Sequence, residues 1–321
     1  MSDFFRKKSL EQLLNTANEK GLKKTLGVWA LVALGIGAII GAGLFVRTAA
    51  ASAEAAGPAV TLSFVVAAVG CLFAGLCYAE FAAMIPIAGS AYTYAYATMG
   101  EIVAWVIGWA LIMEYALGAA TVSIAWSEYL NNLLGGSIPY QWCHSPFETS
   151  AGGIHGIMNI PALFILLALS LLLIKGTKES AFVNGIIVFI KVAIVLVFIA
   201  IGWGFIKPAN HTPYLIPDGV AGHEGVFKHG WGGVLGGAAI VFFAFIGFDA
   251  VSTAAQEAKN PKRDMPIGIL GSLLVCTILY ILFSHVLTGV ANWQEFEKAG
   301  KEASVAYAIN KYMIGFGWLG T

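Results

Sequence analysis

The chain has 321 residues, of which 58% are hydrophobic and only 11% are charged, and its 18 Lys and Arg balance its 18 Asp and Glu. Soluble domains are about 45–50% apolar and about 25% charged. The composition therefore excludes an ordinary soluble domain and predicts an all-α polytopic membrane protein embedded in a lipid bilayer. A net charge of zero gives no reason to expect a nucleic-acid partner.

Residues 1–24 form a polar, basic leader, which is predicted to be an amphipathic helix on the cytoplasmic membrane surface. Seven apolar runs follow, each close to the roughly 20 residues that a helix needs to cross the hydrocarbon core. They are residues 25–53, 59–84, 101–130, 157–174, 181–206, 231–256 and 266–291. Residues 293–312 are expected to be polar and partly helical, and residues 315–321 to open an eighth span. The segment 87–100 holds Tyr92, Tyr94 and Tyr96, which are interpreted as an interfacial aromatic belt.

Lys and Arg are distributed unevenly between the connecting segments. With the N-terminus inside, the inner segments hold eleven of them and the outer segments five. The positive-inside rule therefore predicts a multi-pass protein of the plasma membrane with a cytoplasmic N-terminus and an extracellular loop at residues 207–230.

Glycine is concentrated in the middle of the first apolar run. Glycine costs roughly 1 kcal/mol against alanine inside a helix, so Gly37, Gly41 and Gly43 indicate a helix that breaks near the middle of the membrane. The freed backbone groups must then face protein or a polar cavity. Close helix packing through small residues explains this stretch equally well when it is taken alone.

A second interrupted span favours the break. The sixth run has a glycine in its middle, Gly247, and a carboxylate two residues later, Asp249. Paired interrupted spans in two halves of a chain point to a transporter site, and spans one and six imply an inverted five-span repeat. The helix N-terminus after Gly41 would attract an anion, while unwound carbonyls near Phe243 to Ile246 would attract a cation. In such a fold, the two sites together fit the backbone of an amino acid.

Two segments resemble a known family. They are residues 36–46 (IGAIIGAGLFV) and residues 242–268, which begin FFAFIGFD and end EAKNPKRDMPIG. Both are similar to the signature segments of the amino acid–polyamine–organocation (APC) superfamily, and the chain looks most like a bacterial member of its cationic amino acid transporter branch. The resemblance implies a LeuT-like five-plus-five inverted repeat with discontinuous helices 1 and 6.

The resemblance also implies a domain organisation. Residues 25–206 would form the first five-span repeat, residues 207–230 the extracellular loop, and residues 231–321 the start of the second, inverted repeat. The family fold has ten core spans, whereas this chain covers spans 1–7 and the start of span 8. The second repeat is therefore expected to be truncated.

The family pattern further implies the substrate site. The substrate carboxylate would meet backbone N–H groups around Ala42, the ammonium would meet backbone carbonyls, and Phe243 and Phe245 would wall the side-chain pocket. The predicted substrate-binding residues are Ile39, Ile40, Gly41, Ala42, Gly43, Phe243, Ala244, Phe245, Ile246 and Gly247.

Several charged residues lie within predicted spans, where each charge is costly and needs a reason. Lys191 resembles the lysine that replaces a sodium ion in proton-coupled relatives, and it is predicted to carry the coupling proton; the alternative is a permanently charged lysine bonded to carbonyls of the first span. Glu114 and Asp249 are candidates for the substrate route or a gate. Glu114 could equally be a structural carboxylic acid, and Asp249 could cap the helix that follows the break. Arg47, near the outer end of span 1, is interpreted as an interfacial or gate contact.

The leading hypothesis is a secondary transporter of L-amino acids with broad neutral or cationic specificity, working by proton-coupled symport and alternating access. An exchanger without proton coupling and a non-transporting amino acid sensor are the alternatives. No paired catalytic groups or metal-ligand spacing stand out, so neither an enzyme nor a metal site is expected, and no cofactor beyond the coupling proton. The sequence gives no indication of an accessory subunit.

Overall fold

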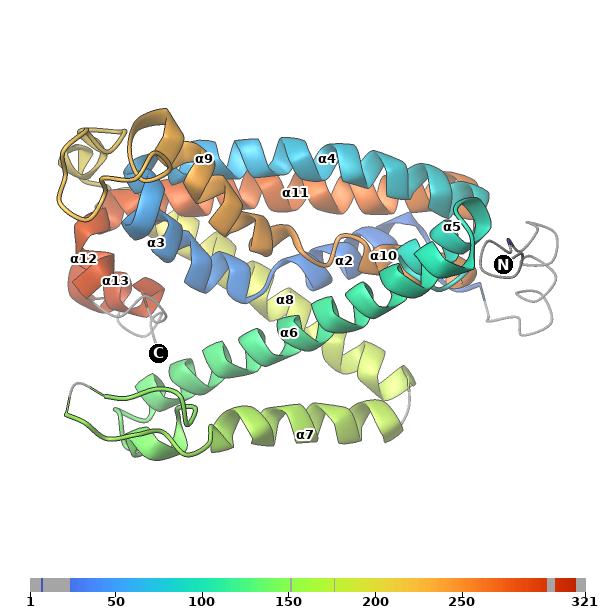
Figure 1. Cartoon of the computed structure of the whole chain (residues 1–321), viewed down its shortest axis with the longest axis horizontal. Coiled ribbons are helices and arrows are strands. Elements are labelled where there is room, and N and C mark those ends of the chain that lie inside the picture. Colours follow the sequence, from blue (N-terminus) through green and yellow to red (C-terminus); the bar gives the residue numbers. More distant parts are fainter. Residues whose placement is uncertain (1–6, 8–23, 151, 176, 299–303, 316–321) are drawn as a thin grey trace. The chain divides into compact units, whose positions relative to one another are not determined.

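The computed structural model describes residues 7, 24–150, 152–175, 177–298 and 304–315, whose course Figure 1 colours from blue to red. The chain divides into two compact units. Unit 1 comprises Met1–Ile40, Val65–Ala116 and Phe245–Ile278, and unit 2 comprises Gly41–Phe64, Leu117–Ala244 and Leu279–Thr321. The predicted leader helix and the predicted start of the eighth span lie outside the described residues, apart from Lys7, Lys24 and Gly315.

Helices make up most of the described chain, as the composition predicts. The longer ones are α2 (Val28–Ile39), α4 (Val60–Met84), α5 (Ser90–Thr98), α6 (Glu101–Leu133), α7 (Ile160–Lys175), α8 (Thr177–Gly202), α9 (Gly230–Val241), α11 (Pro261–Val290) and α13 (Ser304–Tyr312). The shorter ones are the π-helices η2 (Gly43–Arg47) and η3 (Ser52–Ala56), the 3₁₀ turns η4 (Gly57–Ala59), η5 (Tyr140–Trp142), η6 (Trp203–Phe205), η7 (Pro208–His211), η8 (Phe242–Phe245) and η9 (Ala255–Glu257), and the short α-helices α3 (Thr48–Ala51), α10 (Ala250–Thr253) and α12 (Trp293–Lys298). The expectation of a partly helical segment at residues 293–312 is confirmed.

Five helical stretches of the described chain are long and apolar enough to cross a membrane. They are Gly43–Met84, Glu101–Leu133, Gly185–Phe205, Gly230–Thr253 and Pro261–Val290. Two shorter apolar helices, Val28–Ile39 and Ile160–Ile174, fall in the first and fourth predicted spans. The all-helical, polytopic class is therefore supported, while the inverted five-plus-five repeat remains a prediction.

In unit 1, α2 packs closely against the first half of α11 because small residues lie between them. A Cβ built on Gly268 would lie 2.8 Å from the Leu31 side chain. The residues preceding α2 are fixed as well, since the Leu26 N–H donates to the Glu257 carbonyl at 2.9 Å and the Lys259 N–H donates to the Leu26 carbonyl at 2.8 Å. Glycine in such contacts allows two helix backbones to approach each other.

The aromatic segment after α4 is a helix, α5, and its central tyrosine is not part of an interfacial belt. Tyr94 is only 4% exposed and stacks on Phe81 at 5.1 Å between ring centroids. Tyr92 and Tyr96 stack on each other instead, 6.1 Å apart. Residues four apart share one face of a helix, whereas a residue two positions away points to nearly the opposite side, so the helix directs Tyr94 into the unit.

In unit 2, α9 packs against η3 through glycines. A Cβ on Gly233 would overlap the carbonyl of Ala55, and one on Gly237 would lie 2.8 Å from the Ala56 side chain. His223, in the loop that precedes α9, is buried and places its Nε2 2.9 Å from the Ala53 carbonyl. These contacts hold η3 against α9. In the chain, η3 follows the predicted break in the first span, and α9 precedes the predicted break in the sixth.

Candidate functional site: two interrupted helices and a charged pocket

The first predicted span is interrupted where its glycines cluster. Helix α2 ends at Ile39, and Ile40 has an extended backbone, with φ −72° and ψ 109°. Helical structure resumes at Ala42 and continues as the π-helix η2. The first N–H groups of a helix have no partner within that helix, so the restart presents backbone donors at the predicted carboxylate-binding residues.

The sixth predicted span is interrupted as well. Helix α9 ends at Val241, the backbone tightens into the 3₁₀ turn η8, and Gly247 follows with φ +108°. A positive φ of this size suits glycine and strains other residues. The α-helical hydrogen bonds therefore do not run continuously through either span. A binding site built from backbone N–H and carbonyl groups requires such an interruption.

Within unit 2, the two interruptions meet. A Cβ on Gly43 would overlap the backbone of Ala244, so only glycine allows these segments to lie so close. The buried Tyr280 of α11 donates its hydroxyl to the Ala244 carbonyl at 2.9 Å. Tyr280 thus holds the chain at the point where η8 departs from α-helical geometry.

Within unit 1, the other parts of the same interruptions meet. The Ala38 carbonyl oxygen lies 2.7 Å from where a Cβ on Gly247 would be. Ile40 and Phe245 are fully buried. The ten predicted site residues thus divide equally: Ile39, Ile40, Phe245, Ile246 and Gly247 belong to unit 1, whereas Gly41, Ala42, Gly43, Phe243 and Ala244 belong to unit 2.

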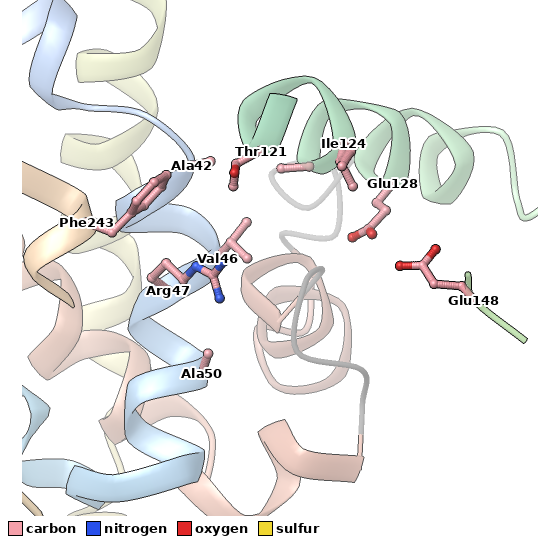
Figure 2. Close-up of a pocket in the computed structure, with 10 residues that line it drawn as sticks. Ala42, Val46, Arg47, Ala50, Thr121, Ile124, Glu128, Glu148 and Phe243 are labelled. Carbon is pink, nitrogen blue, oxygen red and sulfur yellow. The ribbon is translucent and has the colours of Figure 1, made fainter. Parts of the chain in front are cut away.

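Unit 2 also contains a pocket beside its part of the site. We name it the Arg47 pocket; it has a volume of about 240 Å³ and is lined by Ala42, Val46, Arg47, Ala50, Thr121, Ile124, Ala125, Glu128, Glu148 and Phe243. The Arg47 guanidinium lies over the Phe243 ring, 5.7 Å from its centroid, a cation–π arrangement. Figure 2 shows the carboxylates of Glu128 and Glu148 directed toward each other in this pocket.

Asp249 does not cap the helix that follows the second break. It occupies the residue before α10, but its side chain makes no capping hydrogen bond. Its carboxylate is buried and instead accepts hydrogen bonds from the Tyr115 hydroxyl at 2.8 Å and, at 3.4 Å, from the Ser90 hydroxyl. The expected capping role is therefore wrong, because α5 and α6 bring hydroxyl donors to the carboxylate.

The two other charged residues predicted to act in transport, Glu114 and Lys191, lie on long helices. Glu114 is half-buried on the unit 1 part of α6, close enough to Asp249 for their charges to interact. Lys191 is half-buried near the middle of α8 in unit 2. The roles predicted for both remain predictions.

Sequence reasoning missed four polar residues, Tyr115, Tyr280, Glu128 and Glu148. One signal was available: Thr121 and Glu128 are seven residues apart and therefore share a face of one helix. The other partners are too distant along the chain to be found by spacing.

In the part of the chain that the structure describes, no group of three His, Cys, Asp or Glu residues could hold a metal ion.

Comparison with known proteins assigns the family. Residues 26–320 match the amino acid permease family. The branched-chain amino acid permease BcaP of Bacillus subtilis is 47% identical over 98% of this chain and 64% of its own length. The methylthioribose transporter of the same organism is 44% identical over 90% of this chain and 60% of its own length. The cationic amino acid transporter 4 of Homo sapiens is 36% identical over 97% of this chain and 47% of its own length.

The chain thus spans between 47% and 64% of the length of these three relatives. The family match, by contrast, covers nearly all of the chain and includes both interrupted helices. The resemblance drawn from residues 36–46 and 242–268 is therefore confirmed, and the chain belongs to the amino acid permease family of APC transporters.

Proposed function

We propose that the protein is a secondary active transporter of L-amino acids across the plasma membrane. The observation that carries this proposal is the close approach of the two interruptions, Gly43 against Ala244 in unit 2 and Gly247 against Ala38 in unit 1. Backbone polar groups freed in this way need a polar partner within a membrane protein. The names of the relatives, a branched-chain amino acid permease and a cationic amino acid transporter, support an amino acid as that partner.

Each interruption would bind one charge of the substrate backbone. The restart of the first helix at Ala42 presents N–H groups and the positive end of a helix dipole, which suit a carboxylate. Within unit 2, a carbonyl released near Phe243 suits an ammonium. Because neither contact involves the substrate side chain, this arrangement is compatible with broad specificity among L-amino acids.

The interruptions would also serve as hinges for alternating access. The boundary between the two compact units passes between Ile40 and Gly41 and again between Ala244 and Phe245. Each interrupted helix therefore contributes one part to each unit. Residues at the ends of helical elements are the usual positions that absorb backbone rotation in such motions.

We further propose proton-coupled symport through Lys191. The test is uptake of L-leucine into proteoliposomes that contain the full-length protein, with and without an inward proton gradient. We expect the gradient to accelerate uptake by the wild-type protein and to have no effect on Lys191→Ala. Lys228→Ala is the matched control, because Lys228 is exposed on a loop, and it should respond as the wild type does.

Two results would contradict the coupling. Equal uptake with and without the gradient by the wild type would reject symport, and an unaltered response of Lys191→Ala would reject the role of that residue. Uptake that requires an amino acid inside the vesicle would indicate an exchanger. Binding of L-leucine without any flux would indicate a sensor and would overturn the transport function as a whole.

A further inference from the structure

Four basic side chains gather at one end of unit 1. Lys24 precedes α2, whereas Lys259, Lys262 and Arg263 lie around the start of α11, and all four are exposed. The backbone holds the two segments together, because the Lys259 N–H donates to the Leu26 carbonyl at 2.8 Å. We name these four basic residues the basic cluster.

The carboxylates of the same segments do not pair with the basic cluster. Asp264 is only 4% exposed, and its Oδ2 accepts a hydrogen bond from the Asn260 N–H at 3.1 Å within the first turn of α11. Glu257 is half-buried. Within the described residues, none of the four basic side chains makes a hydrogen bond or an ion pair. The cluster therefore presents an excess of positive charge at the surface.

An exposed apolar stripe continues from the basic cluster along α11. Ile267, Leu274 and Ile278 are 42%, 62% and 49% exposed, respectively. Because a helix turns by about 100° per residue, these three side chains share one face of α11 with Arg263. A charged helix end thus leads directly into a surface of aliphatic side chains.

The surroundings of the basic cluster are typical of a membrane–water boundary. Trp29, in the first turn of α2, is 84% exposed, and tryptophan is enriched at such boundaries. The distribution of Lys and Arg predicts that this boundary is the cytoplasmic one. Anionic lipids of the cytoplasmic leaflet attract groups of Lys and Arg that adjoin a membrane-spanning helix.

We propose that the basic cluster and the apolar stripe of α11 together bind an anionic phospholipid, such as phosphatidylglycerol. The basic side chains contact the headgroup phosphate, and the stripe contacts an acyl chain. A free phosphate ion would use the cluster but would bury no apolar surface on the stripe. A zwitterionic lipid would use the stripe but would bring its own ammonium group to the cluster. Only an anionic lipid is complementary to both parts.

The lipid would bind where both interrupted helices reach one end of unit 1. The Leu26 N–H, just before α2, donates to the Glu257 carbonyl at the end of η9 at 2.9 Å. The segment that leads to the first interruption and the segment that follows the second are therefore joined beside the basic cluster. A lipid bound there holds both segments at the same membrane surface.

The test measures which lipids the purified full-length protein retains in detergent. The protein is incubated with equal amounts of phosphatidylglycerol and phosphatidylcholine, and mass spectrometry gives the ratio of the two bound lipids. The variants are Lys262→Gln alone and the triple variant Lys259→Gln, Lys262→Gln and Arg263→Gln. The matched control for the single variant is Lys228→Gln, because Lys228 is also an exposed lysine but belongs to unit 2.

We expect the wild type to retain phosphatidylglycerol in preference to phosphatidylcholine and the triple variant to lose that preference about tenfold, because three cationic contacts are removed. Lys262→Gln should lose less, and Lys228→Gln should behave as the wild type does. Inorganic phosphate at the concentration of the lipid should not displace phosphatidylglycerol. An unchanged unfolding temperature shows that the triple variant is folded, and Lys262→Gln gives the same test with one substitution if it is not.

Three results would overturn the inference. They are a wild-type protein without a preference between the two lipids, a folded triple variant with the wild-type preference, and displacement of phosphatidylglycerol by inorganic phosphate, which would indicate a site for free anions. In each of these cases the proposed amino acid transport still stands, because uptake of L-leucine tests it separately.

Discussion

At the scale of single residues, two tyrosine hydroxyl groups set the geometry around the helix interruptions. Tyr280 donates to the Ala244 carbonyl, 36 residues away along the chain, and Tyr115 donates to Asp249, 134 residues away. The pattern of glycines predicted the interruptions, but spacing along the chain could not predict these partners. A hydrogen bond between distant segments depends on how the helices pack, and local patterns do not contain that information.

The neighbouring histidines His211 and His285 predict that the stability of the fold depends on pH. The His211 ring lies 4.6 Å from the ring of His285, its Nε2 is 3.3 Å from the Thr288 hydroxyl, and Tyr214 lies 6.2 Å away. Burial lowers the pKa of His211 from its ordinary value of 6.5, and the nearby His285 lowers it further. The folded state therefore binds a proton less readily than the unfolded state, and it loses stability as the pH falls through and below 6.5.

We expect the thermal unfolding temperature of the purified protein to fall between pH 7.5 and pH 5, and His211→Gln to reduce that fall, because the variant has no imidazole to protonate there. The control is His155→Gln, which alters a histidine of an exposed loop and should follow the wild type. A His211→Gln variant with the wild-type pH dependence would contradict the prediction.

At the scale of elements, glycine and backbone geometry decide where the two helices stop. Gly247 has a left-handed backbone and faces the Ala38 carbonyl, so alanine there would meet both backbone strain and a close contact. We expect Gly247→Ala to lower the free energy of unfolding by roughly 1–3 kcal/mol and to impair transport. Thermal unfolding in detergent and uptake of L-leucine measure the two effects.

Gly70→Ala is the matched control for that substitution. Gly70 lies within α4, and a Cβ built on it would meet no described atom within 4 Å. Alanine is favoured over glycine in a helix interior by about 1 kcal/mol, so this variant should be as stable as the wild type or more so. If Gly247→Ala proved as stable as Gly70→Ala, the interruption would not depend on the glycine.

At the scale of the whole molecule, the distribution of Lys and Arg predicts which side of the membrane each loop faces. Lys228 on a loop and Lys262 in the first turn of α11 are both exposed, and their segments are predicted to face opposite sides. With the exposed Cys77 replaced by serine, we expect an impermeant maleimide to label Lys228→Cys in intact cells. It should label Lys262→Cys only after the cells are permeabilised. The reverse pattern would show that the N-terminus is outside.

The sequence by itself determined the class of protein, the family and the positions of the two interruptions. These follow from composition, from glycines within apolar runs and from contiguous signature segments, all of which are local properties. It also predicted helices close to their observed bounds, because an apolar run of a given length crosses a bilayer in few ways.

Only the tertiary structure decided which side chains meet. It buried Tyr94, paired Asp249 with Tyr115 rather than with the helix that follows it, and brought Arg47, Glu128 and Glu148 to one pocket. These residues come from different segments of the chain, and their contacts depend on how the helices pack. The different faces of such a helix have similar, mostly apolar compositions. The physical reason is that an apolar helix has almost no sequence signal for which of its faces meets a partner.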